Sequence, residues 1–394
     1  MGKLWEKKVK PDKEIIRFTV GKDYSLDERL IVYDCLSSIA HAEMLLKIGV
    51  LKKDEKEEIV KILNEIIALS KEGHFKITFE DEDCHTKIEN YLTNKLGDLG
   101  RKIHTARSRN DQVLTALRLY YKDELREIEN LAKLLMESLK KISKKFGRVK
   151  IPGFTHTRKA MVSSVKLWAG CFVEALNDDI KFLRNVSNLI DMSPLGTAAG
   201  YGVPILKIDR KLTKEILGFK RLQKNPIYVQ NSRGKFEAEI ASALSMILYD
   251  VNKLSSDIIF FSEDDMKIIE IPEEFTTGSS IMPHKKNLDV FEIARANYSK
   301  IISLELRLKT LPMNLISGYH RDLQITKETI FETFDVTKET LKIVAMVVEK
   351  LKVNVKQAKK SITDELLATE KVYQLVEKGV PFRKAYKMVA DEFH

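Results

Sequence analysis

The sequence predicts an all-α protein: a central bundle of about five long helices with smaller helical N- and C-terminal domains. Turn-forming residues are scarce, with 17 Gly and 9 Pro among 394 residues, whereas 44% of the residues are hydrophobic, enough for a large buried core. Apolar side chains recur at three- and four-residue spacing over segments longer than an ordinary helix. Their apolar faces are wide and no internal repeat is visible, which favours a bundle over a coiled coil or a repeat array.

The longest periodic segment runs from Asn110 to Phe146 without a Gly or Pro. This segment predicts one continuous helix. Further long helices are predicted over 159–189, 235–261, 285–310 and 327–350, and shorter ones over 25–48 and 54–71. The predicted domains are an N-terminal helical domain at 1–105, the central long-helix bundle at 106–352 and a C-terminal helical domain at 353–394.

The formal net charge is +10 and the sequence pI is about 9.1. Such an excess of positive charge favours binding to nucleic acid, to an acidic membrane surface or to an anionic small substrate. Lys and Glu are interleaved along most helical segments, as in "KKDEKEEIVK" at 52–61, which predicts solvated mixed faces rather than a basic stripe. We therefore expect a small anionic substrate, and neither nucleic acid nor a membrane as partner. A DNA-binding bundle is the alternative, and it predicts a steep salt dependence.

The cysteines Cys35, Cys84 and Cys171 are odd in number and far apart, so neither a disulfide framework nor a cysteine metal site is expected. The eight histidines show no HExxH or comparable ligand spacing. The N-terminus is too charged for a signal peptide, and no apolar run approaches the length of a membrane span. We expect a cytoplasmic protein without a metal or cofactor.

Three polar clusters interrupt the apolar pattern near predicted helix starts: "HTARSRNDQV" at 104–113, "PGFTHTRKAM" at 152–161 and "TTGSSIMPHKKNLD" at 276–289. The first and third clusters place cations, among them Arg107, Arg109 and Lys285, where the helix macrodipole disfavours them. A shared anionic ligand would explain both clusters. The alternative is that the arginines pair with nearby carboxylates such as Glu82 or Asp83.

Single residues in these clusters also have ordinary explanations. His156, placed at a helix entry by the pattern, would alone be a structural histidine, and Ser279 would be a loop or capping hydroxyl. Ser108 and Asp111 are placed to cap the helix beside them. No GxSxG elbow occurs, so a hydrolase triad has little support.

Helix geometry constrains how the clusters can meet. A helix over 110–146 spans about 55 Å at 1.5 Å per residue, and the short connection at 147–157 makes the next long helix its antiparallel neighbour. The clusters around Asn110 and His156 are therefore predicted at opposite ends of one hairpin. If both clusters serve one site, they must come from different subunits.

Taken together, these segments resemble the argininosuccinate lyase family of the fumarase/aspartase superfamily. "GSSIMPHKKNLD" is similar to the superfamily's GSSxMPxKxN stretch, "HTARSRNDQV" to the family's H-T-x-R-S-R-N-D-Q, and "PGFTHTRKAM" to its P-G-Y-T-H-L-Q. Further matches are "EDCHTKIE" at 82–89, "SPLGTAAGYG" at 193–202 and "GYHRDLQITKE" at 318–328. The matches follow in order from about residue 18 to 340, and the RSRNDQ run is specific within the superfamily.

The resemblance implies a homotetramer whose active sites each draw on three chains. It implies cleavage of argininosuccinate to arginine and fumarate in arginine biosynthesis, without a cofactor. The implied catalytic residues are Ser279 in a mobile loop, His156, and Glu292, which orients the histidine. The implied substrate-binding residues are Lys285 and Asn287, which hold a carboxylate, together with Asn110, Thr155, Tyr319, Gln324, Lys327, Arg109, Ser108, His85 and, where the family has a serine, Asp23.

The chemistry explains why these residue types are needed. Removing a proton from carbon beside a carboxylate leaves a doubly charged, enolate-like intermediate, which requires fixed donors and cations. Lys285, Asn287 and a helix N-terminus would supply them. Ser279 would act as the base in a dry, cationic pocket closed by a loop hinged at Gly278. His156 would protonate the leaving group directly, act through water, or only bind carboxylate.

Adenylosuccinate lyase is the nearest alternative enzyme, because it also releases fumarate from an N-succinyl compound. The RSRNDQ run, Gln324 and Lys327 favour argininosuccinate. A crystallin-like structural homologue is the alternative outside enzymes, and the intact catalytic matches disfavour it. Four further departures from the family pattern remove no catalytic match: His284, Leu288, Arg158 and Lys159.

Overall fold

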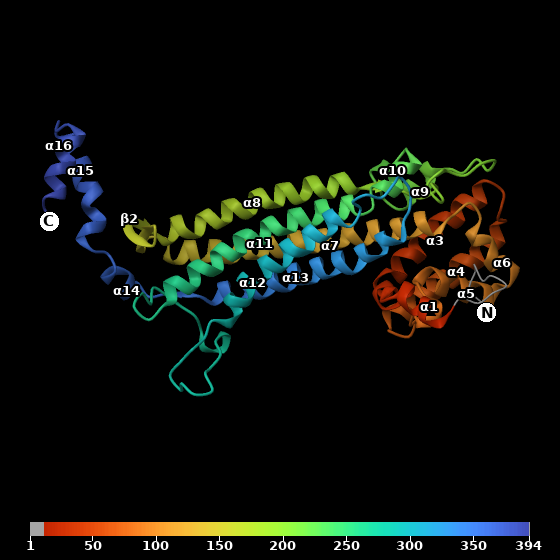
Figure 1. The fold of residues 1–394 in the computed structure, drawn as a ribbon, viewed down its shortest axis with the longest axis horizontal. Coiled ribbons are helices and arrows are strands. Elements are labelled where there is room, and N and C mark those ends of the chain that lie inside the picture. The colour runs from red at the N-terminus through yellow and green to blue at the C-terminus, as the bar shows by residue number, and fades with distance from the viewer. Residues whose placement is uncertain (1–11, 394) are drawn as a thin grey trace. The chain divides into compact units, whose positions relative to one another are not determined.

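The computed structural model describes residues 12–393, and most of that part of the chain is α-helical (Figure 1). The longest helices are α7 (Arg109–Phe146), α8 (Val165–Ile190), α11 (Lys235–Ser262), α12 (Asp289–Thr310) and α13 (Thr326–Lys350). They correspond to the predicted long segments, so the all-α class with a bundle of about five long helices is confirmed. Among the described residues, strands form short pairs: β1 (Lys150–Thr155) with β2 (Arg158–Ser164), β3 (Met192–Ser193) with β4 (Arg221–Leu222), and β5 (Ile269–Glu270) with β6 (Lys352–Val353).

The chain forms two compact units. The first unit takes the described residues up to 127, with 183–243 and 303–335; the second takes 128–182, 244–302 and the described residues from 336. Shorter helices of the first unit are α1 (Lys13–Val20), α2 (Asp23–Leu26), α3 (Ile31–Lys47), α4 (Lys53–Lys71), α5 (Cys84–Leu96), α6 (Asp98–Arg101), α9 (Arg210–Ile216) and α10 (Pro226–Asn231). Those of the second unit are α14 (Val355–Lys360), α15 (Ala368–Glu377) and α16 (Phe382–Ala390). The predicted domain boundaries at 105 and 352 stay a prediction.

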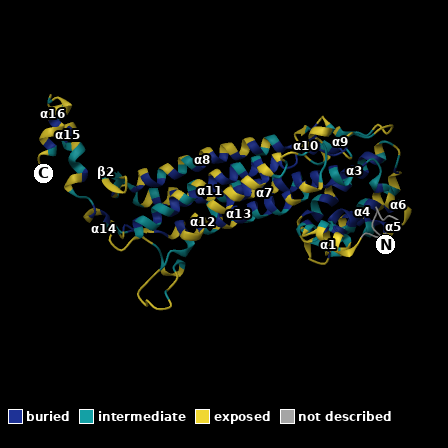
Figure 2. Cartoon of the chain, viewed as in Figure 1, coloured by how far each residue is buried: buried dark blue, intermediate teal, exposed yellow. Residues whose placement is uncertain are grey.

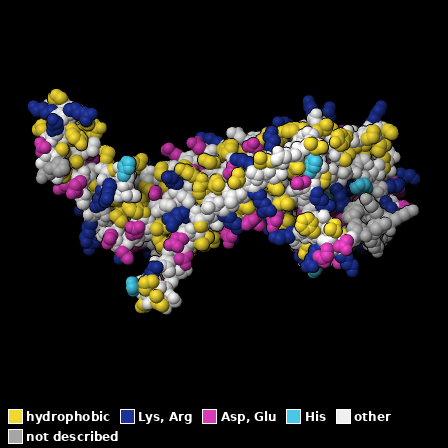
Figure 3. All heavy atoms as spheres, viewed as in Figure 1, with side chains coloured by type: hydrophobic (Ala, Val, Ile, Leu, Met, Phe, Trp, Pro, Cys, Tyr) yellow, Lys and Arg dark blue, Asp and Glu magenta, His cyan; other side chains and the backbone are white. Residues whose placement is uncertain are grey.

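The long helices bury the apolar stripe that the sequence pattern predicted. On α7, Leu117, Ile128, Leu135 and Leu139 have no exposed surface, and burying one such side chain contributes about 1.5–3 kcal/mol. Figure 2 shows buried and exposed residues alternating along the long helices. On the face visible in Figure 3, basic and acidic side chains are interspersed, as the interleaved Lys and Glu predicted. Within residues 12–393, no helix has both the length and the apolar character needed to cross a membrane.

Ser108 and Asp111 cap the start of α7, as the sequence predicted. The Ser108 hydroxyl accepts a hydrogen bond from the Asn110 amide at 3.3 Å, and Asp111 accepts one from the Ser108 amide at 2.9 Å. The second carboxylate oxygen of Asp111 accepts from the amides of Gly196 and Ala198, both at 2.9 Å. The same side chain therefore fixes the helix start and ties the Gly-rich loop after β3 to it.

Residues 158–164 form strand β2, so the predicted helix over 159–189 started too early. His156 and Thr157 have φ of 51° and 58°, the left-handed values of both central residues in a type I′ hairpin turn. Such a turn reverses the chain directly into an antiparallel pair, and Thr155 lies opposite Arg158. The helix begins only after Ser164, whose hydroxyl accepts from the Leu167 amide at 3.1 Å. His156 therefore lies at a hairpin tip and not at a helix entry.

The helix predicted over 285–310 also begins later, at Asp289. The backbone of Asn287 pairs with that of Thr277, with N–O distances of 2.8 and 3.1 Å. This bridge places Lys285 and Asn287 in a loop. The prediction that these two residues stand at a helix N-terminus is therefore wrong, because the backbone groups of Asn287 already bond across the loop base.

The stability of the second unit should depend on pH through Asp179 on α8. Burial, and next the neighbouring Asp250 of α11, raises the pKa of Asp179 to about 7. Between about pH 4 and pH 7 the folded protein then holds a proton that the unfolded chain releases, so stability falls as pH rises through that range and levels off above it. We expect the wild type to lose on the order of 2 kcal/mol between about pH 5 and pH 8.

Chemical denaturation at both pH values measures this loss. The Asp179→Asn variant should lose less stability, because its amide does not titrate. Asp178→Asn is the matched control, since the Asp178 side chain is 77% exposed and is the smallest of the influences that raise the pKa of Asp179, and it should keep most of the wild-type dependence. An unchanged pH dependence in Asp179→Asn would contradict the prediction.

Candidate active site

A cleft of about 160 Å³ lies within the first unit, where several helices begin. The segments around it are the starts of α2, α5, α7 and α11 and the turn leading into α13. The unpaired amides of helix N-termini favour anions. The lining residues are Val20, Asp23, Glu82, Asp83, His85, Arg109, Asn110, Val113, Arg233, Tyr319, Arg321, Gln324 and Lys327.

Seven residues predicted to bind substrate line this one cleft, although they come from segments as far apart as Asp23 and Lys327. They are Asp23, His85, Arg109, Asn110, Tyr319, Gln324 and Lys327. Ser108 lies beside them as the cap of α7. Their assignment as substrate contacts stays a prediction.

Lys327 is a buried ammonium held between two carboxylates. It is 3% exposed, and its Nζ lies 2.7 Å from Asp27 and 2.9 Å from Asp23. Burial alone would lower the pKa of Lys327, but Asp27 and Asp23 outweigh that effect and raise it. Lys327 therefore stays charged in the wall of the cleft.

The two arginines at the start of α7 have different roles. Arg109 lies 3.2 Å from Asp83 and 3.7 Å from Glu82, which is the carboxylate pairing considered as the alternative to ligand binding. Arg107 is buried and donates to the Ser38 hydroxyl at 2.7 Å. Arg107 is absent from the cleft lining, so the idea that both arginines serve one anionic ligand is wrong for it.

His85 is a buried histidine of the cleft wall. Its Nδ1 lies 3.1 Å from the Asp34 carboxylate, which also accepts from the Gln112 amide at 2.8 and 3.0 Å. Burial lowers the pKa of His85, but Asp34 outweighs it, so the net shift is upward. Because Asp34 is fully buried, the pair keeps the imidazole ring in one orientation.

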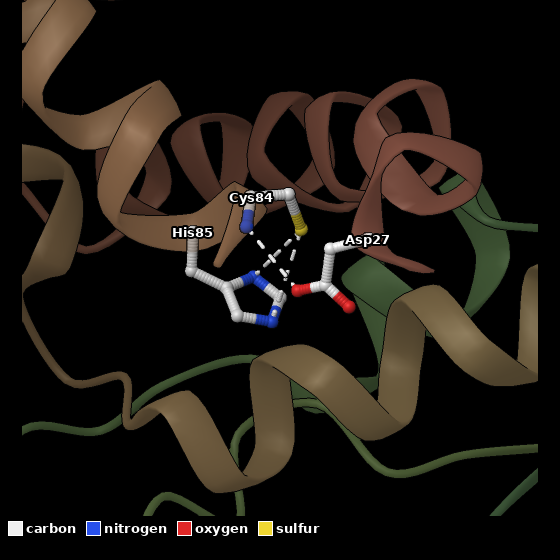
Figure 4. Close-up of side chains that lie close together, drawn as sticks. All are labelled: Asp27, Cys84 and His85. Carbon is white, nitrogen blue, oxygen red and sulfur yellow. Dashed lines mark hydrogen bonds between the residues drawn. The ribbon is translucent and has the colours of Figure 1, made fainter. Parts of the chain in front are cut away.

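Asp27, Cys84 and His85 place three potential metal ligands within 4.8 Å of one another (Figure 4). Each group already has another partner. The Asp27 oxygens accept from Lys327 at 2.7 Å and from the Cys84 amide at 3.2 Å, and burial raises the pKa of the Cys84 thiol well above its ordinary value. An ammonium on the same carboxylate competes with a metal cation, so the cluster fits a hydrogen-bonded wall better than a metal site.

The turn before α13 is tied to the end of α1 and carries Tyr319. Gln324 donates to the carbonyl oxygens of Thr19 and Val20 at 3.0 and 3.2 Å. The Tyr319 ring lies 5.5 Å from the Arg233 guanidinium carbon, within cation–π range. The hydrogen bonds of Gln324 therefore hold this wall of the cleft against the C-terminal end of α1.

Several lining residues were missed as site residues by the sequence reasoning. They are Val20, Glu82, Asp83, Val113, Arg233 and Arg321. Arg233 carried a usable signal, because it is a cation two residues before the start of α11, the feature that drew attention to the other clusters. Arg233 is 3% exposed, and its Nε lacks a hydrogen-bond partner in the described part of the chain.

The remaining predicted residues belong to the second unit. Thr155 and His156 are exposed at the β1–β2 turn, and Thr157 beside them is a β-branched residue at positive φ, a costly conformation that occurs preferentially at functional sites. Glu292 is exposed on the first turn of α12. Among residues 12–393, no hydrogen bond or ion pair joins His156 to Glu292, so the predicted orienting contact is absent within one chain.

Ser279 lies in the loop that the Thr277–Asn287 bridge closes at its base. Its Oγ accepts hydrogen bonds from the amides of Met282 at 3.1 Å and Ile281 at 3.4 Å. The side-chain amide of Asn287 donates to the Gly278 carbonyl at 3.1 Å. Lys285 is exposed on the same loop. The loop therefore presents a hydroxyl, with two amide donors aimed at its oxygen, together with a cation.

Comparisons with known proteins identify the family of the chain. A family model described as "Lyase" matches residues 8–303. The argininosuccinate lyase of Thermotoga neapolitana is 52% identical over 99% of this chain and 98% of its own length. That of Bacteroides fragilis strain YCH46 is 42% identical over 98% of this chain and 86% of its own length.

Two solved structures share the fold. EDDS lyase in complex with formate has a TM-score of 0.80 at 21% identity, covering 97% of this chain and 76% of its own. Class II fumarase from Schistosoma mansoni has a TM-score of 0.80 at 16% identity, covering 96% of this chain and 91% of its own. The family match over three quarters of the sequence and the full-length identity to named enzymes confirm the resemblance read from the motifs, and the chain belongs to the argininosuccinate lyase family.

Proposed function

We propose that this chain is a carbon–nitrogen lyase that cleaves argininosuccinate into arginine and fumarate, a step of arginine biosynthesis. The observation that carries the proposal is the convergence of the family's substrate-binding motifs on one cleft whose wall bears both signs of charge. Arg233 suits a carboxylate and Asp23 suits a cationic group, whereas Arg109 pairs with Asp83 and Glu82 within the wall. Argininosuccinate carries both kinds of group.

Ser279 is proposed as the base that removes the proton from carbon. A serine hydroxyl is a weak base in water, so its deprotonated form must be stabilised. The amides of Met282 and Ile281 already point at the Ser279 oxygen, and Lys285 adds a positive charge on the same loop. Fixed donors of this kind stabilise an oxyanion without reorganising during the reaction.

His156 and Glu292 are proposed to act on the departing guanidine group and its surroundings. Protonation of a leaving nitrogen is general acid catalysis, a role that histidine side chains often perform. The hairpin tip presents His156 to solvent in a strained turn. Thr155, Lys285 and Asn287 are proposed to bind the succinyl part of the substrate.

We infer that the complete site is shared between subunits of a homotetramer. Asn110 stands in the first turn of α7, whereas β1 and β2 follow its last turn, and a continuous helix of 38 residues is about 57 Å long. Exposed apolar side chains on α11 and α12, namely Met246, Tyr249, Ile302 and Leu306, suit burial against a second copy of this chain.

Mixing two inactive variants tests the shared site. Asn110→Ala and Ser279→Ala should each be inactive alone. Reassembled together at equal amounts, they should recover about a quarter of the wild-type activity, because random mixing gives both intact groups to about one site in four. Mixed tetramers that form, as seen by native mass spectrometry, but stay inactive would argue against sharing.

The substrate is tested by supplying argininosuccinate and adenylosuccinate separately and following fumarate by ultraviolet absorbance. Fumarate should appear with argininosuccinate, and activity only on adenylosuccinate would overturn the choice. We further propose that the enzyme works in the cytoplasm and has no nucleic acid partner. Weak retention of DNA without a steep salt dependence is the expected behaviour.

A further inference from the structure

Asp23 is a second carboxylate on an ammonium that one carboxylate already neutralises. Asp27 is fully buried and lies 2.7 Å from Lys327. Asp23 precedes it by one helical turn, lies 2.9 Å from the same Nζ, and lines the cleft with its side chain 15% exposed. Two carboxyl groups therefore share one ammonium, and the partly exposed one, Asp23, faces the cleft.

The other carboxylates of the cleft wall are compensated by another residue. Asp83 and Glu82 lie 3.2 and 3.7 Å from Arg109. Burial raises the pKa of Asp23, as does Asp27, while Lys327 and Arg233 lower it. Asp23 is therefore the acidic group of this wall that a further cation would stabilise most.

Arg233 is a buried cation of the same wall, and its Nε has no hydrogen-bond partner among the described residues. Its side chain is 3% exposed, it lines the same cleft as Asp23, and its positive charge lowers the pKa of the Asp23 carboxyl. A guanidinium at a cleft wall can bind a carboxylate. A surplus carboxylate and a guanidinium in one cleft wall are complementary to a zwitterion, which carries both an ammonium and a carboxylate.

We propose that Asp23 and Arg233 form a receptor for an α-amino-acid headgroup, in which Asp23 binds the α-ammonium and Arg233 the α-carboxylate. Resting on the proposed function, this assigns the pair to the arginine half of argininosuccinate. Asp23 is then the residue that selects for a free α-ammonium group.

Competition experiments with product analogues test the receptor. L-arginine, 5-guanidinopentanoate, which lacks the ammonium, and agmatine, which lacks the carboxylate, are compared as inhibitors of fumarate release. The wild type should prefer arginine over each analogue by about ten- to hundredfold, the range expected for one lost charged hydrogen bond. Asp23→Ser should lose the preference over 5-guanidinopentanoate and keep that over agmatine, and Arg233→Gln should do the reverse.

In Asp23→Ser, KM for argininosuccinate should rise more than kcat falls. Asp23→Asn keeps the side-chain shape and serves if the serine variant is unstable, as judged by thermal unfolding. Asp335→Asn is the control, because Asp335 pairs with Arg29 at 2.7 Å and is absent from the cleft lining, and its inhibitor ratios should match the wild type.

Each failure has its own signature. A wild type that releases no fumarate from argininosuccinate refutes the proposed function. A wild type that cleaves it, with Asp23 variants that retain the preference for arginine over 5-guanidinopentanoate, refutes the receptor alone. Equal inhibition of the wild type by arginine and 5-guanidinopentanoate also refutes the receptor.

Discussion

Replacing Ser279 by alanine should lower kcat for fumarate release by about 10²–10⁴-fold, the range for loss of a positioned proton-transfer group. The Ser279 oxygen accepts hydrogen bonds from two backbone amides, which stabilise its deprotonated form. The methyl group of alanine cannot accept a proton, so the variant lacks the proposed base. Binding should change less than turnover, because the cleft in the first unit is untouched. Steady-state kinetics with argininosuccinate, followed by fumarate absorbance, give kcat and KM separately.

Ser280→Ala is the matched control for this prediction. Ser280 is the exposed neighbour on the same loop, and its hydroxyl has no assigned role in the reaction. Its kcat should stay within a few-fold of the wild type. Essentially unchanged turnover in Ser279→Ala would remove the serine from the mechanism, and an equal loss in both variants would point to loop structure instead of proton transfer.

Replacing Lys327 by methionine should destabilise the protein by about 3–5 kcal/mol, the cost of removing one partner from a buried charge pair. The variant leaves Asp27 fully buried without its ammonium partner, and it leaves Asp23 beside it. Activity should fall as well, since Lys327 lines the cleft. Chemical denaturation measures the stability change, and a loss below about 1 kcal/mol would contradict the assigned pairing.

A double variant separates stability from function. In Lys327→Met with Asp27→Asn, the buried charge is removed, so part of the lost stability should return while activity stays low. Lys47→Met is the control for removing an exposed ion pair: Lys47 pairs with Asp209 at 2.7 Å and is 57% exposed, so its unfolding midpoint should change little. Equal losses in the single and double variants would mean that packing, and not charge, causes the effect.

Local sequence patterns were sufficient for the long helices. The apolar spacing of residues 110–146 matches α7, which starts one residue earlier and ends at Phe146, because burying one face is the same requirement wherever the helix lies in the fold. The capping of α7 by Ser108 and Asp111 was also predictable, since both hydrogen bonds close within three residues.

The starts of α8 and α12 were not predictable in the same way. The turn at His156 and Thr157 requires positive φ at two residues that rarely adopt it, so nothing in their identity indicates a hairpin. Asn287 pairs with Thr277 across ten residues. A helical apolar period cannot report a backbone partner that lies outside the window being read.

The sequence by itself determined the all-α class, the positions of the long helices and the motifs that assign the chain to its lyase family, because each of these depends on neighbouring residues. Only the tertiary structure decided which charges face the cleft: Arg107 turns away to Ser38, Arg109 is compensated by Asp83, and Lys327 meets Asp23 and Asp27 from about 300 positions away. Coulombic and hydrogen-bond partners act through space, so their identity follows from folding and not from spacing along the chain.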